Sequence, residues 1–279
     1  MKRMAWIRFV ASRWFRSGRD SGPTLAPATA GIAVGVAALL CVIGVMNGFQ
    51  MGFIDAVLEL DSYHVRVPSG GTSTAAVRAA VPGATAALPF IDLRTMAANR
   101  RGKAAALRIK IVPDDALVAD PTLASRLEFR TGAFGGGLAI GSELSRQLDL
   151  RVGDAVSVLA VSADEELGVD ARMVELTISG IFHSGYYDFD AALAFLPGSA
   201  AGSLSGGESP VIGIKLADRY DDARALAGLA AAGIPGAESW RDYNRAFFGA
   251  LRMEKSVMMM LVGLIFIVVG VNIDRKSVV

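Results

Sequence analysis

The sequence is poor in the residues that build disulfide frameworks and metal sites. It has one cysteine, Cys41, and two histidines, His64 and His183, which lie far apart. A single cysteine excludes an intramolecular disulfide, and no Cys/His group has the spacing of a zinc site. Lys and Arg total 28 against 27 Asp and Glu, so the net charge of +1 does not favour nucleic-acid binding. We therefore expect no bound metal and no nucleic-acid partner.

Catalytic and nucleotide-binding patterns are also missing. The glycine-rich stretches 132–137 and 202–207 are not followed by Lys-Ser/Thr, so they predict loops rather than a phosphate-binding loop. Asp188 and Asp190 form a possible carboxylate pair, although apolar alternation across 189–195 favours a strand with a polar entry. We find no catalytic triad, and we expect no cofactor and no enzymatic activity in this chain.

Two uncharged apolar runs are the main features that the sequence does contain. The first is Ala28–Phe49 and the second is Val257–Ile273, and mean hydropathy over the chain is +0.42. A bilayer core about 30 Å thick needs roughly 20 apolar residues in a helix. The sequence therefore predicts transmembrane helices over 28–49 and 256–273, which flank a globular domain over 50–255.

The charges around the first run predict its orientation, because Lys and Arg mark the cytoplasmic side. Residues 50–63 carry only acidic charges, at Asp55, Glu59 and Asp61. The N-terminus is therefore predicted to be cytoplasmic and residues 50–255 to lie outside. Arg252 and Lys255 oppose this orientation weakly. Basic residues precede the first run at Lys2, Arg3, Arg8, Arg13, Arg16 and Arg19, with one acid at Asp20.

The N-terminal region leaves alternatives open. A signal peptide would need a shorter apolar region and an A-x-A cleavage site. Leu39-Leu40-Cys41 resembles a lipoprotein processing site, but leucine precedes the cysteine and the apolar run continues. Met4–Arg16 has the apolar spacing and basic residues of an interfacial helix, and the alternative is a flexible basic tail. We interpret residues 1–27 as a cytoplasmic interfacial helix and elbow.

The outer region predicts an α+β fold, because strands and helices mix without regular alternation. Gln50–Asp61 continues the helical period of the first run as a stalk. The runs 155–161 and 173–182 are expected to pair as a long hairpin around the loop 162–170. Further strands are predicted over 63–67, 87–97, 104–112, 138–140, 191–196 and 211–216, and helices over 74–80, 121–128, 220–232 and 240–255 and from 141–143 onward.

Four segments, in this order, resemble one family of proteins. They are 45–49 (VMNGF), 138–154 (LAIGSELSRQLDLRVGD), 178–190 (ISGIFHSGYYDFD) and 240–257 (WRDYNRAFFGALRMEKSV). The chain resembles the LolC/LolE lipoprotein-releasing permeases, within the wider MacB/FtsX-type ABC transporters, over most of residues 5–273. The resemblance implies an inner-membrane permease with four spans and a periplasmic domain between the first two. ATP hydrolysis in such a machine extracts lipoproteins mechanically and passes them to a periplasmic chaperone.

The resemblance also implies partners and a different end to the chain. The partners are an ABC ATPase, a second permease subunit, acylated lipoproteins, membrane lipid and the periplasmic chaperone. The family's second span continues apolar past the position of Asn272-Ile273, whereas here Asp274–Val279 follow. We therefore expect 274–279 to be a truncated cytoplasmic end, without the third and fourth spans.

Three groups of residues are candidate sites. Val42, Met46, Phe49 and Phe53 share one helix face at i, i+4, i+7 and i+11, which predicts a lipoprotein pocket, with plain helix packing as the alternative. The pairs Gly31/Gly35 and Gly44/Gly48 have the G-x-x-x-G spacing of close helix packing, although glycine is common in spans. The acidic hairpin tip, with Asp164, Glu165, Glu166 and Asp170, could steer a basic chaperone or be a solvated loop.

Two other functions fit the same layout. A MacB-type permease that exports drugs or peptides shares the span–domain–span order, although the segments 178–190 and 240–257 favour lipoprotein release. A two-span sensor with an outer ligand-binding domain also fits. It would need a signalling module after the second span, and none is present in the sequence.

Overall fold

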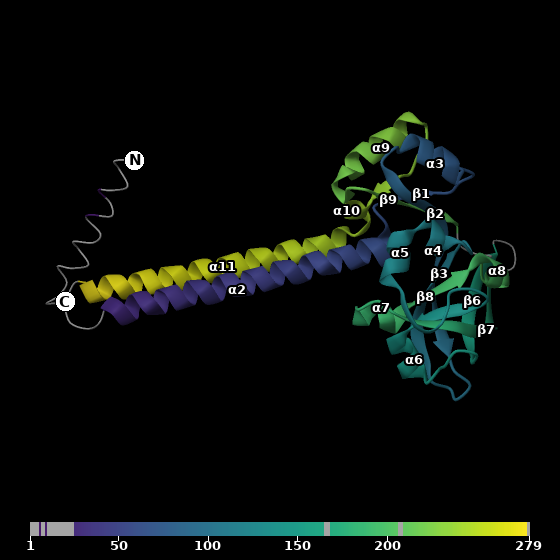
Figure 1. Cartoon of the computed structure of the whole chain (residues 1–279), viewed down its shortest axis with the longest axis horizontal. Helices are drawn as coiled ribbons and strands as arrows, with labels where there is room; N and C mark the ends of the chain where they lie inside the picture. Colours follow the sequence, from purple (N-terminus) through teal and green to yellow (C-terminus); the bar gives the residue numbers. More distant parts are fainter. Residues whose placement is uncertain (1–5, 7–8, 10–24, 165–167, 206–208, 278–279) are drawn as a thin grey trace. The chain divides into compact units, whose positions relative to one another are not determined.

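The computed structural model describes Trp6, Phe9 and residues 25–164, 168–205 and 209–277 (Figure 1). The chain divides into two compact units, Met1–Asp55 and Ala56–Val279. The predicted interfacial helix over 4–16 lies outside the described residues except for Trp6 and Phe9, whose side chains are exposed.

The first unit is dominated by one long helix, α2 (Leu25–Ala56). Pro27 lies in its first turn, where a missing backbone N–H costs no intrahelical hydrogen bond. The predicted span 28–49 falls inside this helix. Among the described residues, one helical stretch is long and apolar enough to cross a membrane, Ala33–Ser62, near the N-terminus. Helix α2 therefore begins before the predicted span and continues into the predicted stalk.

The second unit begins with the π-helix η2 (Val57–Ser62), which follows α2 directly in sequence. Its first sheet has the strand order β10-β1-β9-β2, made of β1 (Val65–Pro68), β9 (Val211–Leu216), β10 (Glu238–Ser239) and the first half of β2 (Ala84–Ala98). Helices α3 (Thr74–Ala80) and α9 (Asp222–Ala231) cover one face of it. Val77, Ala225 and Leu229 from these helices pack against Val65, Ile212 and Ile214 of the strands.

The long strand β2 links this sheet to a closed barrel. Its residues 84–90 pair with β9, whereas residues 91–98 pair with β3 (Ala104–Val112). The ladders then run from β3 through β8 (Leu193–Pro197), β5 (Leu138–Gly141) and β7 (Gly168–His183) to β6 (Ala155–Asp164), which pairs with β2 again. β4 (Glu128–Gly132) adds to β7 at the edge.

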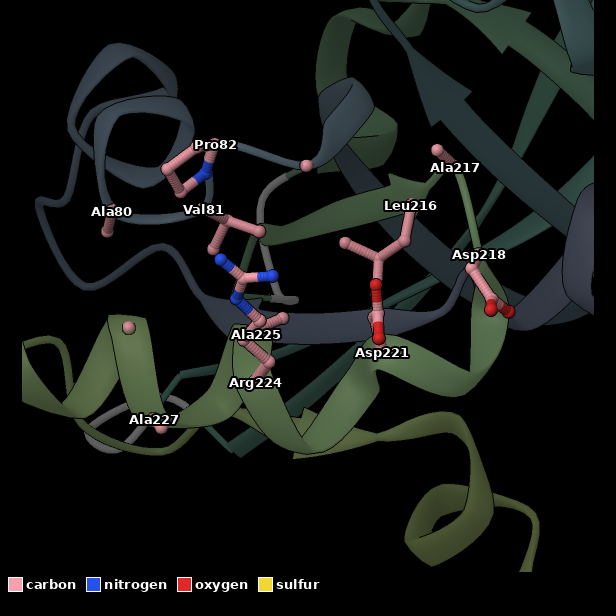
Figure 2. Close-up of a pocket in the computed structure, with 12 residues that line it drawn as sticks. Ala80, Val81, Pro82, Leu216, Ala217, Asp218, Asp221, Arg224, Ala225 and Ala227 are labelled. Atoms are coloured by element: carbon pink, nitrogen blue, oxygen red, sulfur yellow. The ribbon is translucent and has the colours of Figure 1, made fainter.

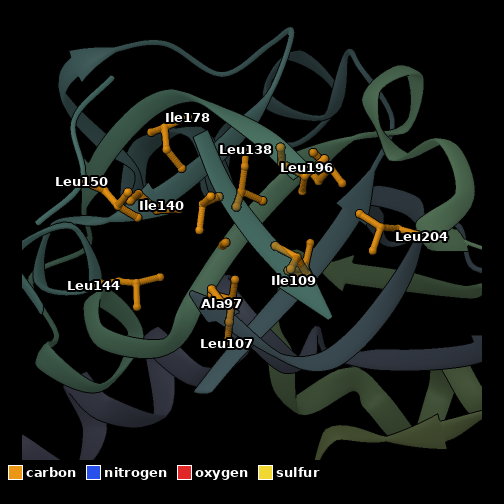
Figure 3. Packing of buried hydrophobic residues seen from close by; sticks show 14 of the residues in the cluster. Ala97, Leu107, Ile109, Leu138, Ile140, Leu144, Leu150, Ile178, Leu196 and Leu204 are labelled. Carbon is orange, nitrogen blue, oxygen red and sulfur yellow. The ribbon is translucent and has the colours of Figure 1, made fainter. Parts of the chain in front are cut away.

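The interior of the barrel is apolar, and Figure 3 shows its packing. Leu107 and Ile109 of β3, Leu138 and Ile140 of β5 and Ile178 of β7 are all at most 3% exposed. Helix α6 (Ser142–Leu148) adds the buried side chains of Leu144 and Leu148. Because successive side chains of a strand point to opposite faces, every second residue of these strands points into the barrel.

Short helices connect these strands, and one of them corrects a prediction. The segment over 188–190 was expected to enter a strand, but it lies in the helix α7 (Tyr187–Ala192), and β8 begins only at Leu193. Aspartates at 188 and 190 disfavour a strand and suit the first turn of a helix. The other connectors are α4 (Ala116–Ala119), α5 (Pro121–Arg126), α8 (Gly198–Ala201), η3 (Gly202–Ser205) and η4 (Arg219–Asp221).

The predicted α+β class is confirmed, and most predicted elements have the expected type. The long hairpin is present, with β6 and β7 paired from Ala155↔Thr177 to Asp164↔Gly168. The helix expected over 240–255 is interrupted, because α10 (Trp240–Tyr243) ends before Asn244 and α11 (Arg245–Ser277) follows. The predicted second span, 256–273, lies within α11, and its crossing of a membrane stays a prediction.

Candidate functional site

The most unusual chemistry in the second unit surrounds the end of η2, where the chain enters the domain. We call this cluster the entry junction. It consists of Glu59, Asp61, Ser62, Tyr63, Arg66, Lys110, Asp120 and Lys215. Several of these charged side chains are buried, and proteins rarely bury such groups without a specific set of partners.

Three cations bind the backbone carbonyls at the end of η2. Lys215 Nζ donates to the Glu59 carbonyl oxygen at 2.9 Å, and Lys110 Nζ donates to that of Asp61. Arg66 donates from Nε to the Ser62 carbonyl oxygen and from Nη2 to that of Asp61, each at 2.8 Å. The last carbonyls of a helix lack intrahelical partners and carry partial negative charge, so buried cations suit this position.

Carboxylates balance these cations. Asp61 Oδ1 lies 2.5 Å from Nη2 of Arg108 and 3.4 Å from Nζ of Lys110. Asp120 Oδ2 lies 2.6 Å from Nζ of Lys215, and the two side chains are 0% and 2% exposed. Asp120 also accepts a hydrogen bond at Oδ1 from the backbone N–H of Leu123, at 3.1 Å, and so caps α5.

Burial and neighbouring charges shift the pKa values of Asp61, Lys110 and Lys215 in this network. Burial alone would raise the pKa of Asp61, but Lys110 and Arg108 outweigh it and hold that pKa below its usual value. Burial lowers the pKa of Lys110 to about 8, and nearby Asp61 limits the fall. Burial likewise lowers the pKa of Lys215, opposed by Asp120. Each buried charge therefore depends on a named partner of opposite sign.

Tyr63 is the turn between η2 and β1. Its φ of 56° is unusual for a residue with a side chain. Its ring stacks on Phe90 at 5.0 Å between centroids, and the Lys110 ammonium lies 5.2 Å from the ring centroid. A Cβ added at Gly213 would lie 2.5 Å from this ring, so only glycine leaves room for it. Burial raises the pKa of Tyr63, which keeps the phenol neutral.

His64 ties the entry junction to the segment that leaves the domain. Its Nδ1 accepts a hydrogen bond from the backbone N–H of Leu216 at 2.8 Å, and its carbonyl accepts one from Trp240 N–H at 2.9 Å. Burial, reinforced by Lys215, lowers the pKa of His64 to about 4. The imidazole is therefore a neutral structural acceptor at physiological pH.

Sequence reasoning missed the entry junction. Its only local signs are Lys110, which shares the mostly apolar run AAALRIKIV with Arg108, and Lys215, the single cation of the run VIGIKL. Periodicity cannot show that both lysines reach the same carbonyls, because their strands are far apart in sequence.

A second polar cluster gathers serine, histidine and aspartate but lacks the geometry of a hydrolase. His183 Nδ1 lies 2.6 Å from Asp190 Oδ2, and Ser142 Oγ lies 3.4 Å from the same Nδ1 and 3.3 Å from the same Oδ2. A catalytic relay needs the serine and the carboxylate on opposite ring nitrogens. Asp190 Oδ1 also accepts bonds from the backbone and hydroxyl of Ser184, both at 2.8 Å, so the cluster fixes the start of α7.

The carboxylate pair considered from the sequence does not exist as a pair. Asp190 is 3% exposed and fully engaged in that cluster, whereas Asp188 is exposed on α7. A helix turn places neighbours at i and i+2 on different faces, which is why the two side chains diverge. Within the described part of the chain, no group of three or more His, Cys, Asp or Glu residues is placed to hold a metal ion.

A cavity of about 500 Å³ lies between the end of α3, the end of β9 and the start of α9 (Figure 2). The buried side chains of Val81, Leu216 and Ala225 are among its lining residues. The charged side chains that line it are Asp218, Asp221 and Arg224. No residue proposed from the sequence as a site lines this cavity.

The candidate sites on the first helix lie as follows. Val42 and Phe49 are 55% and 70% exposed, Met46 and Phe53 are half-buried, and the Phe49 and Phe53 rings stack with centroids 6.5 Å apart. All four are in α2, as are the candidate packing glycines Gly31, Gly35, Gly44 and Gly48, of which the last three are exposed in the isolated chain. The lipoprotein pocket and the close packing of the glycine pairs therefore stay predictions.

The acidic hairpin tip lies largely outside the described residues. Glu165 and Glu166 are not described, and the side chains of Asp164 and Asp170 are not described either. The hairpin that would carry the tip is present, and its two strands pair up to Asp164↔Gly168. The role of the tip in partner binding therefore stays a prediction.

Comparison with known proteins gives a family match over most of the chain. The model of the MacB-like periplasmic core domain matches residues 26–232. The lipoprotein-releasing system transmembrane protein LolC of Xylella fastidiosa strain Temecula1 is 28% identical over 265 residues, which cover 89% of this chain and 63% of that protein. The protein of the same name from Neisseria meningitidis serogroup B is 28% identical over 296 residues, covering 98% and 69%.

The chain thus spans 63% of the length of its Xylella relative. Solved structures give weaker similarity. The extracellular domain of the noncanonic ABC-type transporter YknZ from Gram-positive bacteria has a TM-score of 0.40 at 9% identity, covering 63% of this chain and 98% of that one. The periplasmic region of MacB from Actinobacillus actinomycetemcomitans also has a TM-score of 0.40, at 6% identity, with coverages of 68% and 95%.

Proposed function

Because the chain belongs to the family defined by the MacB-like periplasmic core domain, we propose that it is a permease subunit of an ABC transporter that releases lipoproteins from the inner membrane. The observation that carries this proposal is the similarity to lipoprotein-releasing proteins over 89% of the chain. The match to the MacB-like core domain over residues 26–232 includes the predicted first span as well as most of the predicted outer domain.

In this proposal the protein lies in the inner membrane with its N-terminus in the cytoplasm. Residues 28–49 and 256–273 cross the bilayer, residues 50–255 are periplasmic, residues 1–27 lie on the inner surface and 274–279 are cytoplasmic. The uncharged run 28–49 within α2 supports the first crossing, and the basic N-terminal residues support the orientation.

The proposed partners are an ABC ATPase, a second permease subunit that is a paralogue or a second copy, membrane lipid, acylated lipoproteins and a periplasmic chaperone. ATP hydrolysis belongs to the ATPase, and this chain converts its motion into movement of the periplasmic domain. The entry junction suits such a role, because cationic side chains of β1, β3 and β9 donate hydrogen bonds to the backbone carbonyls at the end of η2.

Three surfaces have roles in the proposal. The face of Val42, Met46, Phe49 and Phe53 receives acyl chains, and the hairpin tip 162–170 binds the chaperone. The glycine pairs 31/35 and 44/48 pack against the partner permease. Cysteines placed at Gly35 or Gly44 should crosslink to the first span of the partner, and their failure to do so would count against that packing.

The test of the proposed function is affinity purification of the protein tagged at its native locus, followed by mass spectrometry. Co-purification of an ABC ATPase and acylated lipoproteins is the expected result. It would also show whether a second permease is present. An absence of any ATPase would contradict the proposal.

A MacB-type export permease for drugs or peptides is the second candidate, because the family model that matches is named for MacB. The same purification separates the two functions. An ATPase accompanied by a periplasmic adaptor and an outer-membrane channel, without lipoproteins, would favour export.

A further inference from the structure

The segments by which the chain enters and leaves the domain both contact the side chain of Arg66. The entry segment is η2, which follows α2 in sequence, and the exit segment is α10, which precedes α11. Arg66, on β1 between them, contacts both. The two segments are far apart in sequence, so this contact exists only because β1 pairs with β10 immediately before α10.

The Arg66 guanidinium donates hydrogen bonds along its edge and contacts aromatic rings with its face. Its edge donates two hydrogen bonds of 2.8 Å, to the carbonyls of Ser62 and Asp61 at the end of η2. Its face lies over the Tyr243 ring of α10, with Cζ 3.7 Å from the ring centroid. The Phe90 ring of β2 lies on it as well, with a Cζ–centroid distance of 5.3 Å.

Only arginine can make this set of contacts. A planar guanidinium donates along its edge while it stacks on an aromatic face, whereas a lysine ammonium is a compact charge on a flexible stem. Arg66 is 8% exposed, whereas its aromatic partner Tyr243 is 38% exposed, so the contact between them is partly buried. Lys110 and Lys215 bind neighbouring carbonyls of η2, but their ring contacts are to Tyr63 and Phe90, which do not belong to the exit segment.

We propose that Arg66 is a positioning residue that couples the entry segment to the exit segment, so that a displacement of η2 is passed to α10 and to β1 together. This inference rests on the proposed function, in which motion must pass between the membrane segments and the periplasmic domain. It assigns the coupling to one side chain and to one aromatic partner, Tyr243.

The experiment measures hydrogen exchange in the full-length protein assembled with its native partners in lipid nanodiscs. Two amides report on the two segments. The Tyr63 N–H donates to the Leu58 carbonyl at 3.1 Å at the end of η2, and the Asn244 N–H donates to the Trp240 carbonyl at 3.0 Å at the end of α10. Peptides that contain each amide are followed in the wild type and in three variants.

The variants separate coupling from local packing. Tyr243→Leu removes the stacked ring and leaves both Arg66–carbonyl bonds possible. Tyr243→Phe keeps the ring and is the matched control. Arg66→Lys keeps the charge and loses the fork and the stacking. We expect Tyr243→Leu and Arg66→Lys to speed exchange at both reporters by about three- to tenfold, as loss of a partly buried cation–π contact would. Tyr243→Phe should match the wild type.

A result in which Tyr243→Leu speeds exchange at Asn244 but leaves Tyr63 unchanged would overturn the inference, because the exit segment would then move alone. The same samples give lipoprotein released per ATP hydrolysed, which should fall for Tyr243→Leu and Arg66→Lys. Absence of lipoprotein release in the wild type would refute the proposed function, whereas the exchange pattern would still decide the role of Arg66.

Discussion

At the residue scale, the buried ion pairs of the entry junction are the contacts whose disruption should lower the stability of the domain most. Lys215 and Asp120 are 2% and 0% exposed and lie 2.6 Å apart. The pair adds little net stability when intact, because desolvation offsets attraction. Removal of one member leaves the other as a buried charge without a partner. The intact pair thus adds little stability while its disruption costs much, which makes it a sensitive test of the described fold.

We predict that Lys215→Met lowers the free energy of unfolding by about 3–5 kcal/mol, the cost of stranding a buried charge. The double variant Lys215→Met/Asp120→Asn should recover part of the loss, since the amide can still cap α5. Arg100→Met is the control, because Arg100 pairs with Glu175 on the surface and should cost less than about 1 kcal/mol. Urea unfolding measures all three, and equal losses would contradict the burial described here.

His64 predicts a pH dependence of stability. Burial, with Lys215, lowers its pKa to about 4 from an ordinary value of 6.5. Between these values the unfolded chain takes up a proton that the folded domain refuses, so the free energy of unfolding falls as pH drops from 6.5 towards 4. The slope from this one group is at most about 1.4 kcal/mol per pH unit.

His64→Asn supplies the control for that pH dependence. Asparagine can place an acceptor near the position of Nδ1, which accepts from the Leu216 N–H, and it does not titrate. In denaturant unfolding, the free energy of unfolding of the variant should no longer show the fall between pH 6.5 and 4 that His64 causes in the wild type. The fall at lower pH that is due to Asp61 should remain. A variant with an unchanged profile across that window would exclude His64 as the source.

At the element scale, the turn from η2 into β1 depends on close approach to β9. Tyr63 adopts a positive φ, and its ring occupies the space above Gly213. Strand β9 pairs with both β1 and β2 there, so neither strand can move away alone.

Gly213→Ala is therefore expected to destabilise the domain by about 1–3 kcal/mol through overpacking. Gly83→Ala is the matched control, because no atom outside its immediate chain neighbours lies within 4 Å of the added Cβ and its φ is not positive. Thermal unfolding followed by near-ultraviolet circular dichroism compares the two. Equal melting temperatures would show that the Tyr63 ring can shift at little cost.

The β6–β7 hairpin is the element that tests the proposed chaperone contact. Its strands pair along ten registered positions, from Ala155↔Thr177 to Asp164↔Gly168. Deletion of residues 162–170 with a short turn in their place should leave the barrel folded and reduce chaperone binding at least about tenfold, the loss expected when charge steering and a docking loop go together. Surface plasmon resonance measures the affinity, and unchanged binding would make the tip a solvated loop.

At the scale of the whole molecule, the proposed lipoprotein path runs along one face of α2. Met46→Asp and Phe49→Asp should abolish lipoprotein co-purification from the full-length complex, because a charge on that face cannot accommodate acyl chains. Cys41→Ser lies outside that set and is the control. The amount of each variant in the membrane fraction must match the wild type, and normal co-purification of both would reject the pocket.

Features that depend on local pattern could be predicted from the sequence. The apolar run 28–49 predicted helix α2, strand-like apolar runs predicted β3 and β9, and the polar loop 162–170 between two such runs predicted the hairpin. These features depend on residues that are close together along the chain, so the spacing of the apolar residues is enough to predict them. The resemblance of four ordered segments supplied the family, which periodicity does not encode.

Which distant residues meet depends on the tertiary structure. Strand β2 joins a small sheet to a closed barrel, and β1 brings Arg66 beside Tyr243. Lys110 and Lys215 reach the same helix end from separate strands, and Asp190 turns inward to His183 instead of pairing with Asp188. Such contacts depend on strand order and register, which are set by the packing of the whole domain, so no local pattern in the sequence specifies them.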